Sequence, residues 1–297
     1  MSKKFVIVSD SCCELTEEMR KEYGVDYIPM YLSYDDKEII ADVDWKVLPI
    51  NEFYDILRAN TRIFTSQIPA FNYQERFEEY IKDGYDILSI SCSSGLSASV
   101  KASMVARDEL KQTYPDAEIY CVDSLNCGKG LGILCIYASR LRAEGKTIEE
   151  TASAIESIKM KVNQLGTVDE LKYLKRAGRI SASKALFGTM LSVKPIIVSN
   201  TEGENVSIEK TKGRNNSMRR LAEMTKEKYT GEAISEIFVS HADCPEDAEK
   251  VKGYILELIP NANVIVSELN PIMGASCGPR TIAVYFVGAE KPNTANA

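Results

Sequence analysis

Short apolar runs alternate with longer helical patterns along the first half of the chain. Three strand-length runs, each followed by polar turn residues, are Phe5 to Val8, Asp86 to Ser91 and Glu118 to Val122. Helical patterns follow them, with Thr16 as an N-cap and with helix formers at Ala98 to Lys111 and Leu131 to Leu141. Strands that alternate with helices predict a parallel sheet covered on both faces.

A second set of apolar runs fills the rest of the chain. Strands are predicted at Pro195 to Ser199, Ile237 to Ser240, Val264 to Ser267 and Ile282 to Val287, with helices at Ser183 to Leu191 and around Ala248 to Leu258. Between the two sets, Thr147 and Glu150 have capping-box spacing. The helix that they open leads out of the first domain and carries on one face Ile148, Thr151, Ile155, Ile158 and Val162.

These patterns predict an α/β protein of two domains. We expect a parallel-sheet α/β domain over residues 1–163 and an α/β domain with a mixed sheet over residues 164–290, followed by a frayed polar tail at 291–297. The length of 297 residues suits two domains that each bury a core.

Composition narrows the partners. The chain is 44% hydrophobic and 27% charged with a net charge of -7, which is typical of a globular protein and argues against nucleic acid as a partner. No apolar run approaches the ~18 to 20 residues of a membrane span, so we expect a cytoplasmic protein without stable membrane insertion. The expected ligand is therefore a small molecule.

Cysteine and histidine usage bears on metals and disulfides. Cys12 and Cys13 are adjacent, and Cys92, Cys121 and Cys135 lie in apolar runs, so all eight cysteines are predicted to be thiols. The chain has one histidine and no C-x-x-C or H-E-x-x-H motif, so no metal site is expected.

Two segments resemble cofactor-binding motifs, but each lacks one of the glycines that its motif requires. Gly145-Lys146-Thr147 resembles the end of a phosphate-binding P-loop, but the position of its first glycine holds Arg140. Gly128, Gly130 and Gly132 suggest a dinucleotide-binding loop, but the last glycine of that motif falls on Ile133. We therefore expect no cofactor.

Three segments at predicted strand ends collect hydroxyl groups. They are Ser9 with Ser11, Thr65-Ser66-Gln67, and Ser93-Ser94-Gly95-Leu96-Ser97. Ligands of open parallel sheets bind beyond the carboxyl ends of the strands, where hydroxyls and free N–H groups can hold a carboxylate or a phosphate. The alternative is that these hydroxyls only cap helices and shape turns.

A serine hydrolase is a competing interpretation. Ser94 or Ser97 would be the nucleophile, Asp10 or Asp123 would orient a base, and the base would have to be His241, the only histidine. No G-x-S-x-G motif supports this arrangement. A lone histidine at a strand end is more often a structural hydrogen-bonding group.

Nine motifs, taken in order, resemble the motif series of the DegV family. They are Ser9-Asp10-Ser11, Thr65-Ser66-Gln67, Ser93-Ser94-Gly95-Leu96-Ser97, Val122-Asp123-Ser124, Asp169-Glu170-Leu171, Gly178-Arg179-Ile180-Ser181, Lys194-Pro195-Ile196, His241-Ala242-Asp243 and Gly278-Pro279. The resemblance covers almost the whole chain. It implies a bacterial two-domain α/β protein that is not itself an enzyme and binds one long-chain fatty acid, such as palmitate, in a tunnel between its domains.

The resemblance also implies a carrier role and site residues. Such proteins present the acyl carboxylate to a separate fatty-acid kinase, for phospholipid synthesis or fatty-acid metabolism. Similarity places the carboxylate at Thr65 and Ser97, with Ser66, Ser93 and Ser94 adjacent. Arg179 becomes a candidate for head-group or kinase contact. Three positions where the chain departs from the family's usual residue are candidates of the same kind, namely Lys212, Ser276 and Arg280.

Other expectations rest on the residues themselves. Ala185 to Leu191 is a candidate tunnel wall, although simple core packing explains its apolar residues as well. A basic cluster, formed by Lys210, Lys212, Arg214, Arg219 and Arg220, is either a docking surface or a solvated segment. The alternative function is a small-molecule phosphotransferase or hydrolase that uses the same anion-binding loops.

Overall fold

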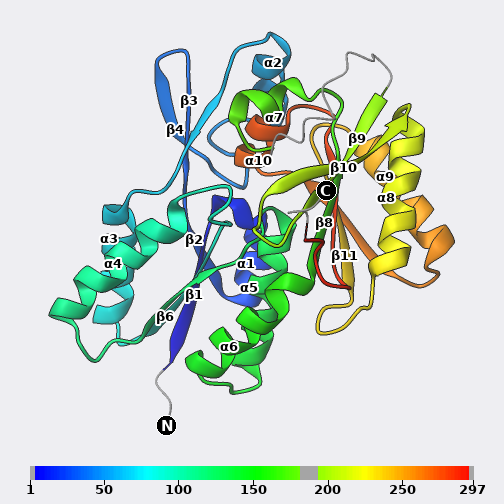
Figure 1. Ribbon diagram of the computed structural model, residues 1–297. Helices are drawn as coiled ribbons and strands as arrows, with labels where there is room; N and C mark the ends of the chain where they lie inside the picture. The colour runs from blue at the N-terminus through cyan, green and yellow to red at the C-terminus, as the bar shows by residue number, and fades with distance from the viewer. Residues whose placement is uncertain (1–3, 181–192, 294–297) are drawn as a thin grey trace.

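The first sheet is fully parallel. The computed structural model describes residues 4–180 and 193–293. Its first sheet has the order β2-β1-β6-β7, with every neighbouring pair parallel. The strands are β1 (Phe5–Asp10), β2 (Val25–Ile28), β6 (Asp86–Ser91) and β7 (Ile119–Asp123). The predicted parallel sheet is confirmed, and its carboxyl ends lie together at one edge of the sheet (Figure 1).

The second large sheet is mixed, as predicted. Its order is β10-β9-β8-β13-β11-β12, and only the pair of β11 and β12 is parallel. The strands are β8 (Val162–Thr167), β9 (Val193–Ser199), β10 (Asn205–Lys212), β11 (Glu236–His241), β12 (Asn263–Glu268) and β13 (Ile282–Val287).

A third, small sheet was not predicted from the sequence. It is antiparallel, has the order β4-β3-β5, and is built from β3 (Tyr31–Tyr34), β4 (Lys37–Ile40) and β5 (Phe64–Ser66). Thr65 and Ser66 therefore lie within a strand, and not in a loop of the parallel sheet as expected. Cross-strand pairing puts Thr65 opposite the buried Leu32.

Helices cover both large sheets, and one helix lies between them. The helices are α1 (Glu17–Tyr23), α2 (Ile50–Arg58), α3 (Ala70–Lys82), α4 (Ser99–Thr113), α5 (Lys129–Ala143), α6 (Ile148–Ile158), α7 (Lys172–Ala177), α8 (Arg214–Lys228), α9 (Pro245–Leu258) and α10 (Pro271–Cys277), with 3-10 turns η1 (Ser11–Cys13) and η2 (Lys159–Lys161). Helix α5 contacts β1 and β6 of one sheet and β8 and β13 of the other. It is buried on nearly all sides, as expected of a helix in the centre of a core.

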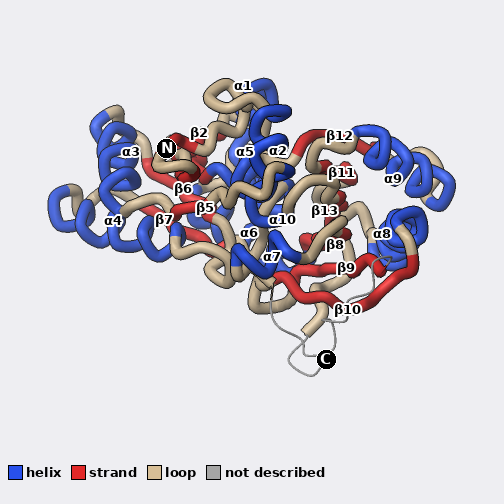
Figure 2. The backbone as a smooth tube through the Cα atoms, turned by 90° about the horizontal axis from the view of Figure 1, so that it is seen from above, coloured by secondary structure: helices blue, strands red, loops and turns tan. Residues whose placement is uncertain are grey.

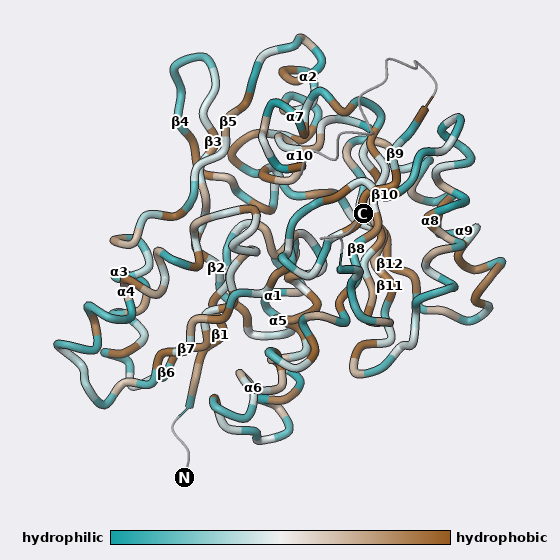
Figure 3. The backbone as a smooth tube through the Cα atoms, in the orientation of Figure 1, coloured by the Kyte–Doolittle hydropathy of each residue, from teal (hydrophilic) through white to brown (hydrophobic). Residues whose placement is uncertain are grey.

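The outer helices complete a layered arrangement. Seen from above, α3 and α4 flank the parallel sheet and α8 and α9 flank the mixed sheet, with α5 in the middle (Figure 2). Hydrophobic residues concentrate on the strands and hydrophilic ones on outer turns such as that between β3 and β4 (Figure 3). Among the described residues, no helix combines the length and the apolar character needed to cross a membrane.

Three expectations need correction or lie outside the described residues. The capping box of Thr147 and Glu150 is present, but α6 ends at Ile158 and Val162 opens β8, so the proposed boundary at 163/164 falls inside that strand. Lys291, expected to fray, is buried, and its Nζ donates to Leu125 O and to Ser199 Oγ. The candidate wall Ala185 to Leu191, with its predicted helix, lies outside the described residues.

Candidate functional site

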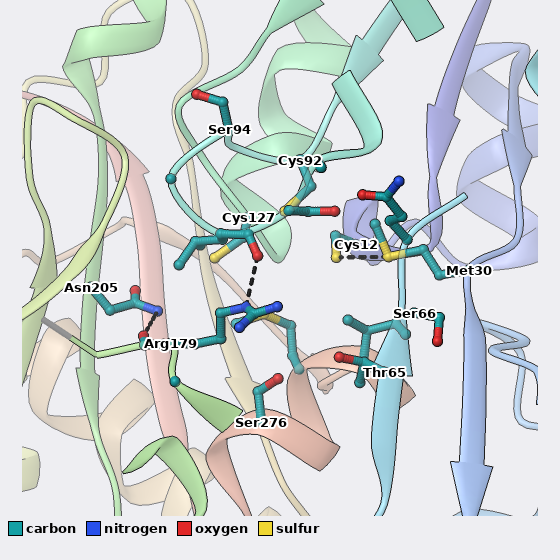
Figure 4. A pocket seen from close by; sticks show the side chains of 18 of the residues that line it. Cys12, Met30, Thr65, Ser66, Cys92, Ser94, Cys127, Arg179, Asn205 and Ser276 are labelled. Carbon is teal, nitrogen blue, oxygen red and sulfur yellow. Dashed lines mark hydrogen bonds between the residues drawn. The ribbon is translucent and has the colours of Figure 1, made fainter. Parts of the chain in front are cut away.

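A cavity of about 350 Å³ lies where the parallel sheet, the small sheet and α10 meet. Turns that follow β1, β6 and β7 supply Cys12, Cys92 and Cys127, so the cavity lies beyond the carboxyl ends of three adjacent parallel strands. The small sheet adds Thr65, and the mixed-sheet half of the chain adds Arg179. Figure 4 shows this convergence of distant segments.

One part of the lining carries sulfur. We call it the sulfur wall, and its residues are Cys12, Met30, Cys92, Cys127, Met273 and Cys277. All six are at most 7% exposed. Cys12 Sγ lies 3.7 Å from Met30 Sδ (Figure 4). Thioether and thiol groups are polarisable and apolar, so this wall suits a flexible hydrocarbon.

Three thiols of the wall are held in their neutral form. Burial raises the pKa of Cys277 to about 12. Burial also raises the pKa of Cys127 well above its usual value, and an interaction with Cys92 together with burial does the same for Cys12. All eight cysteines of the chain are free thiols, as predicted. Cys12, Cys127 and Cys277 therefore bring no negative charge to the cavity at neutral pH.

A second part of the lining is polar and positively charged. Thr65, Arg179 and Ser276 line this cavity and also a second one of about 200 Å³, so they mark the place where the two cavities meet. We call these three residues the waist. Arg179 is held by its Nε, which donates to Leu96 O at 2.8 Å, and by Nη1, which donates to Ala177 O at 2.7 Å.

The charge balance of the main cavity is simple. Among the described lining residues Arg179 is the only charged side chain, and no aspartate or glutamate is present. This contrasts with the net charge of -7 of the whole chain. A cavity with one fixed guanidinium, several hydroxyls and an apolar wall can hold an amphiphile with an anionic head.

The serine loop after β6 divides into cavity-lining and structural residues. Ser94 and Ser97 line the cavity, and Ser97 Oγ lies 2.9 Å from Ser99 Oγ at the start of α4. Ser93 is fully buried and donates to Gly203 O at 2.8 Å, so its hydroxyl joins the two halves of the molecule. Ser66 lines the cavity from β5.

Two carboxylates hold the loops in place. Asp10 Oδ2 accepts from Cys92 N at 2.7 Å and Asp10 Oδ1 from Cys12 N at 2.8 Å, and burial raises the pKa of Asp10 to about 6. Asp123 Oδ1 accepts from Ser94 N at 3.1 Å. The hydroxyls of Ser9 and Ser11 are buried and donate to main-chain carbonyls, so these two residues are structural.

Lys212 and Arg280 are not brought to either cavity. Arg280 donates to Asp247 at 3.0 Å and has a φ of +60°, a conformation that favours glycine. Lys212 is exposed at the end of β10.

The basic cluster is not a free positive surface. Arg214 pairs with Asp247 at 3.2 Å, and Arg219 with Glu257 at 3.8 Å. Arg220 pairs with three glutamates, Glu209, Glu223 and Glu227. The concentration of positive charge inferred from sequence is therefore neutralised in large part, because acids of α8 and α9 and of β10 lie within reach.

The histidine of the hydrolase alternative is not brought to the serines that line the main cavity. His241 lines neither cavity, and its Nδ1 accepts from Cys244 N at 3.4 Å, while burial lowers its pKa. Within the described ranges, no group of three or more His, Cys, Asp or Glu side chains is arranged to hold a metal ion.

Sequence reasoning missed the sulfur wall and Asn205. Asn205 lines the cavity and donates to Arg179 O at 3.0 Å, which helps to place the arginine. Cys92 could have been found, because it directly follows the predicted strand Asp86 to Ser91, whose carboxyl end was expected to meet the ligand. Cys12 comes after the Ser9-Asp10-Ser11 turn that follows the predicted strand Phe5 to Val8, so its signal was less direct. Met30 and Met273 carry no comparable signal, since Met30 lies between the unpredicted strands β2 and β3 and Met273 lies in the unpredicted short helix α10.

Comparison with known proteins gives one consistent result. The profile of the family described as "Uncharacterised protein, DegV family" matches residues 4–289. A DegV domain-containing protein of Clostridium perfringens is 37% identical over 289 residues, which cover 97% of this chain and 99% of that protein.

Solved structures agree in fold. One is described as "Fatty Acid Binding of a DegV family Protein from Thermus thermophilus". It is 21% identical and has a TM-score of 0.85, covering 96% of this chain and 99% of that one. Another, a DegV family protein from Eubacterium eligens described as loaded with heptadecanoic acid, is 22% identical with a TM-score of 0.82 and covers 96% and 100%.

Proposed function

Because the chain belongs to the DegV family, we propose that it binds one long-chain fatty acid between its two halves. The hydrocarbon tail lies along the sulfur wall, and the carboxylate lies at the waist, within reach of Thr65, Arg179 and Ser276. Ser97, Ser94 and Ser66 provide further hydroxyls close to the head group.

One observation carries this proposal. The main cavity combines six buried sulfur side chains with one guanidinium, and its described lining contains no carboxylate. A polar metabolite would leave its groups unpaired against the sulfur wall, which is costly. A cation would face Arg179 without a counter-ion. A fatty acid satisfies both parts, and relatives with this fold are described as binding fatty acids.

The energetics assign different roles to the two parts. Burying about 14 methylenes at ~0.8 kcal/mol each gives roughly 11 kcal/mol of gross transfer free energy. A charge-assisted hydrogen bond contributes about 1.5 to 3 kcal/mol. Association costs consume several kcal/mol of the total. The tail therefore supplies most of the affinity, and the waist fixes which end of the ligand lies where.

The cellular role that we propose is that of a carrier without catalysis of its own. The protein would work in the cytoplasm and present the bound carboxylate to a separate kinase subunit. The position of the waist supports this role, because the second cavity leads from it past Arg62 and Arg176, which are exposed. A head group at the waist is thus closer to solvent than the tail along the buried wall.

Native mass spectrometry of freshly purified protein tests the proposed function. We expect a co-purified adduct with the mass of a long-chain fatty acid, which is released on denaturation and identified by chromatography. Protein that carries no lipid, takes up no hexadecanoate and hydrolyses or transfers phosphate esters would contradict the carrier proposal and support the phosphotransferase or hydrolase alternative.

A further inference from the structure

The second cavity has its own chemistry. It has a volume of about 200 Å³, and we call it the outer chamber. Beyond the waist it is lined by residues of α2, α7 and the segment that leads into β5, and these include Arg62 and Arg176. With Arg179 of the waist, three arginines surround one small space. No aspartate or glutamate is among its described lining residues.

The three arginines are not neutralised by the protein. None of them forms an ion pair with an acid in the described part of the chain, and residues 1–3, 181–192 and 294–297 contain no aspartate or glutamate. Arg62 Nη2 donates to Arg176 O at 2.8 Å, and Arg176 Nη1 donates to Asn60 Oδ1 at 2.9 Å. Their partners are thus neutral oxygen atoms.

Two acids on the neighbouring segments are paired with other cations. Asp55 of α2 pairs with Arg58 at 3.1 Å, and Glu170, which precedes α7, pairs with Lys172 at 2.7 Å. The positive charge around the outer chamber is therefore uncompensated, although the chain as a whole is acidic. An arginine has five N–H donors, so each of the three keeps donors beyond those used on neutral oxygens.

We propose that the outer chamber is a second anion site that binds a phosphate-type oxyanion beside the fatty-acid carboxylate. Guanidinium groups match the oxygens of phosphate in pairs, and three of them suit a tetrahedral group with two charges. The volume of about 200 Å³ is below the ~300 Å³ of typical sites for drug-sized ligands, so the chamber suits a group as small as a phosphoryl group.

Two sources can supply this anion. It is either a free phosphate or a phosphoryl group attached to the head of the lipid, because the chamber and the main cavity share Thr65, Arg179 and Ser276. The second source rests on the proposed function, whereas the first does not. The position of Arg62 over the ring of Phe64, at 4.2 Å, holds its guanidinium beside the chamber in either case.

The test uses the full-length protein and a double variant, Arg62→Gln with Arg176→Gln. Neither residue belongs to the waist, so hexadecanoate binding should change by less than about threefold. Arg219→Gln is the matched control, because it removes an exposed charge from α8, away from the chamber. Thermal unfolding checks that all three proteins are folded.

Three probes are titrated by calorimetry: inorganic phosphate, hexadecyl phosphate and hexadecanoate. If free phosphate is the ligand, it binds with or without hexadecanoate present, and the double variant weakens it at least about tenfold. If the phosphoryl group is attached to a lipid, the double variant binds hexadecyl phosphate at least about tenfold more weakly than wild type, and inorganic phosphate does not bind. Equal binding of both phosphates by wild type and double variant, or binding of neither, overturns the second anion site. Failure of hexadecanoate alone to bind contradicts the proposed function and leaves the inorganic phosphate titration to decide the chamber.

Discussion

The sulfur wall and the waist lie in one cavity but are built in opposite ways. The wall consists of buried side chains, and burial keeps the thiols of Cys127 and Cys277 neutral. The waist consists of hydrogen-bonding groups around a fixed positive charge, and Arg179 is itself held by two main-chain carbonyls. The wall offers apolar surface that contacts a ligand without fixing its orientation. The waist offers hydrogen bonds and a charge that fix orientation but bury little apolar surface.

This difference separates affinity from orientation. Changes at the wall should alter how tightly a tail is held and which chain length fits best, because apolar transfer scales with buried area. Changes at the waist should act only on ligands that carry a carboxylate. The variants at the wall are therefore tested with acids of different chain length, and the charge at the waist with an acid and an alcohol of the same chain length.

The largest effect is expected from filling the wall. Cys92→Phe places a ring where the tail would lie, and displacing about four methylenes at ~0.8 kcal/mol each costs roughly 3 kcal/mol, or about a hundredfold in Kd for hexadecanoate. A ten-carbon acid should lose much less, so the preferred chain length shortens. Affinities are measured by displacement of a fluorescent fatty acid across a chain-length series.

Two controls accompany this variant. Cys92→Met tests a smaller enlargement, and Cys121→Ala removes a thiol that lines neither cavity. A chain-length profile of folded Cys92→Phe that matches wild type would show that the tail does not run along the sulfur wall.

The next effect is expected at the waist. Arg179→Gln should weaken hexadecanoate at least about tenfold, because a charge-assisted interaction is worth about 1.5 to 3 kcal/mol. Hexadecanol, which has the same tail and no carboxylate, should bind both proteins within about twofold. Arg179→Lys keeps the charge without the guanidinium geometry, so its affinity for hexadecanoate should lie between those of wild type and Arg179→Gln. An equal loss for the acid and the alcohol would mean that Arg179 supports the fold of the cavity and not the head group.

A smaller effect is expected from the hydroxyls. Thr65→Val keeps the shape of the side chain and removes one hydrogen bond, so hexadecanoate should weaken about three- to tenfold. Ser97→Ala should act in the same direction, by less, because Ser97 Oγ is shared with Ser99. Calorimetry with both variants measures the change.

Ser93→Ala is the matched control for these hydroxyls. Its Oγ is committed to Gly203 O, so its loss should lower the free energy of unfolding by about 1 to 3 kcal/mol and leave Kd nearly unchanged. If Ser93→Ala weakens binding more than Thr65→Val does, the division of the serine loop described above is wrong.

The smallest effect is expected from pH. The raised pKa values of Cys12, Cys127 and Cys277 keep these thiols neutral, and thiolate would form only as pH rises toward the value of about 12 for Cys277. Affinity for hexadecanoate should therefore change by less than about threefold between about pH 6.5 and 9. A steep loss of affinity in that range would indicate that a thiolate forms in the wall.

Sequence patterns predicted seven strands of the two large sheets but missed β2, β8 and β10. Strand β6 is buried at all six positions, its apolar residues are Ile87, Leu88 and Ile90, and turn residues bound it on both sides, so the predicted range Asp86 to Ser91 matches the strand in full. The capping box at Thr147 and Glu150 was also predicted, because it involves only two residues that are three positions apart in the sequence. By contrast, the short strands of the small sheet carry too few residues to show a period, so the strand that holds Thr65 was expected to be a loop.

The candidate site was predictable in part. Thr65, Ser66, Ser94, Ser97, Arg179 and Ser276 all line a cavity. Arg280 was expected near the head group, and the basic cluster was expected to be either a docking surface or a solvated segment; neither expectation considered ion pairs within the protein. Their acidic partners, such as Asp247 and Glu257, come from α9, and a linear pattern does not show such pairing across elements.

A crystal structure with bromine-terminated hexadecanoic acid tests the central claim most directly, because the anomalous signal of bromine marks the end of the tail. The account predicts a bromine peak in van der Waals contact with the sulfur wall, near Cys92 and Cys127, and carboxylate oxygens within hydrogen-bond distance of Thr65 and Arg179. Bromine in the outer chamber with the carboxylate against the sulfur wall, or a ligand outside the cavity altogether, would contradict it.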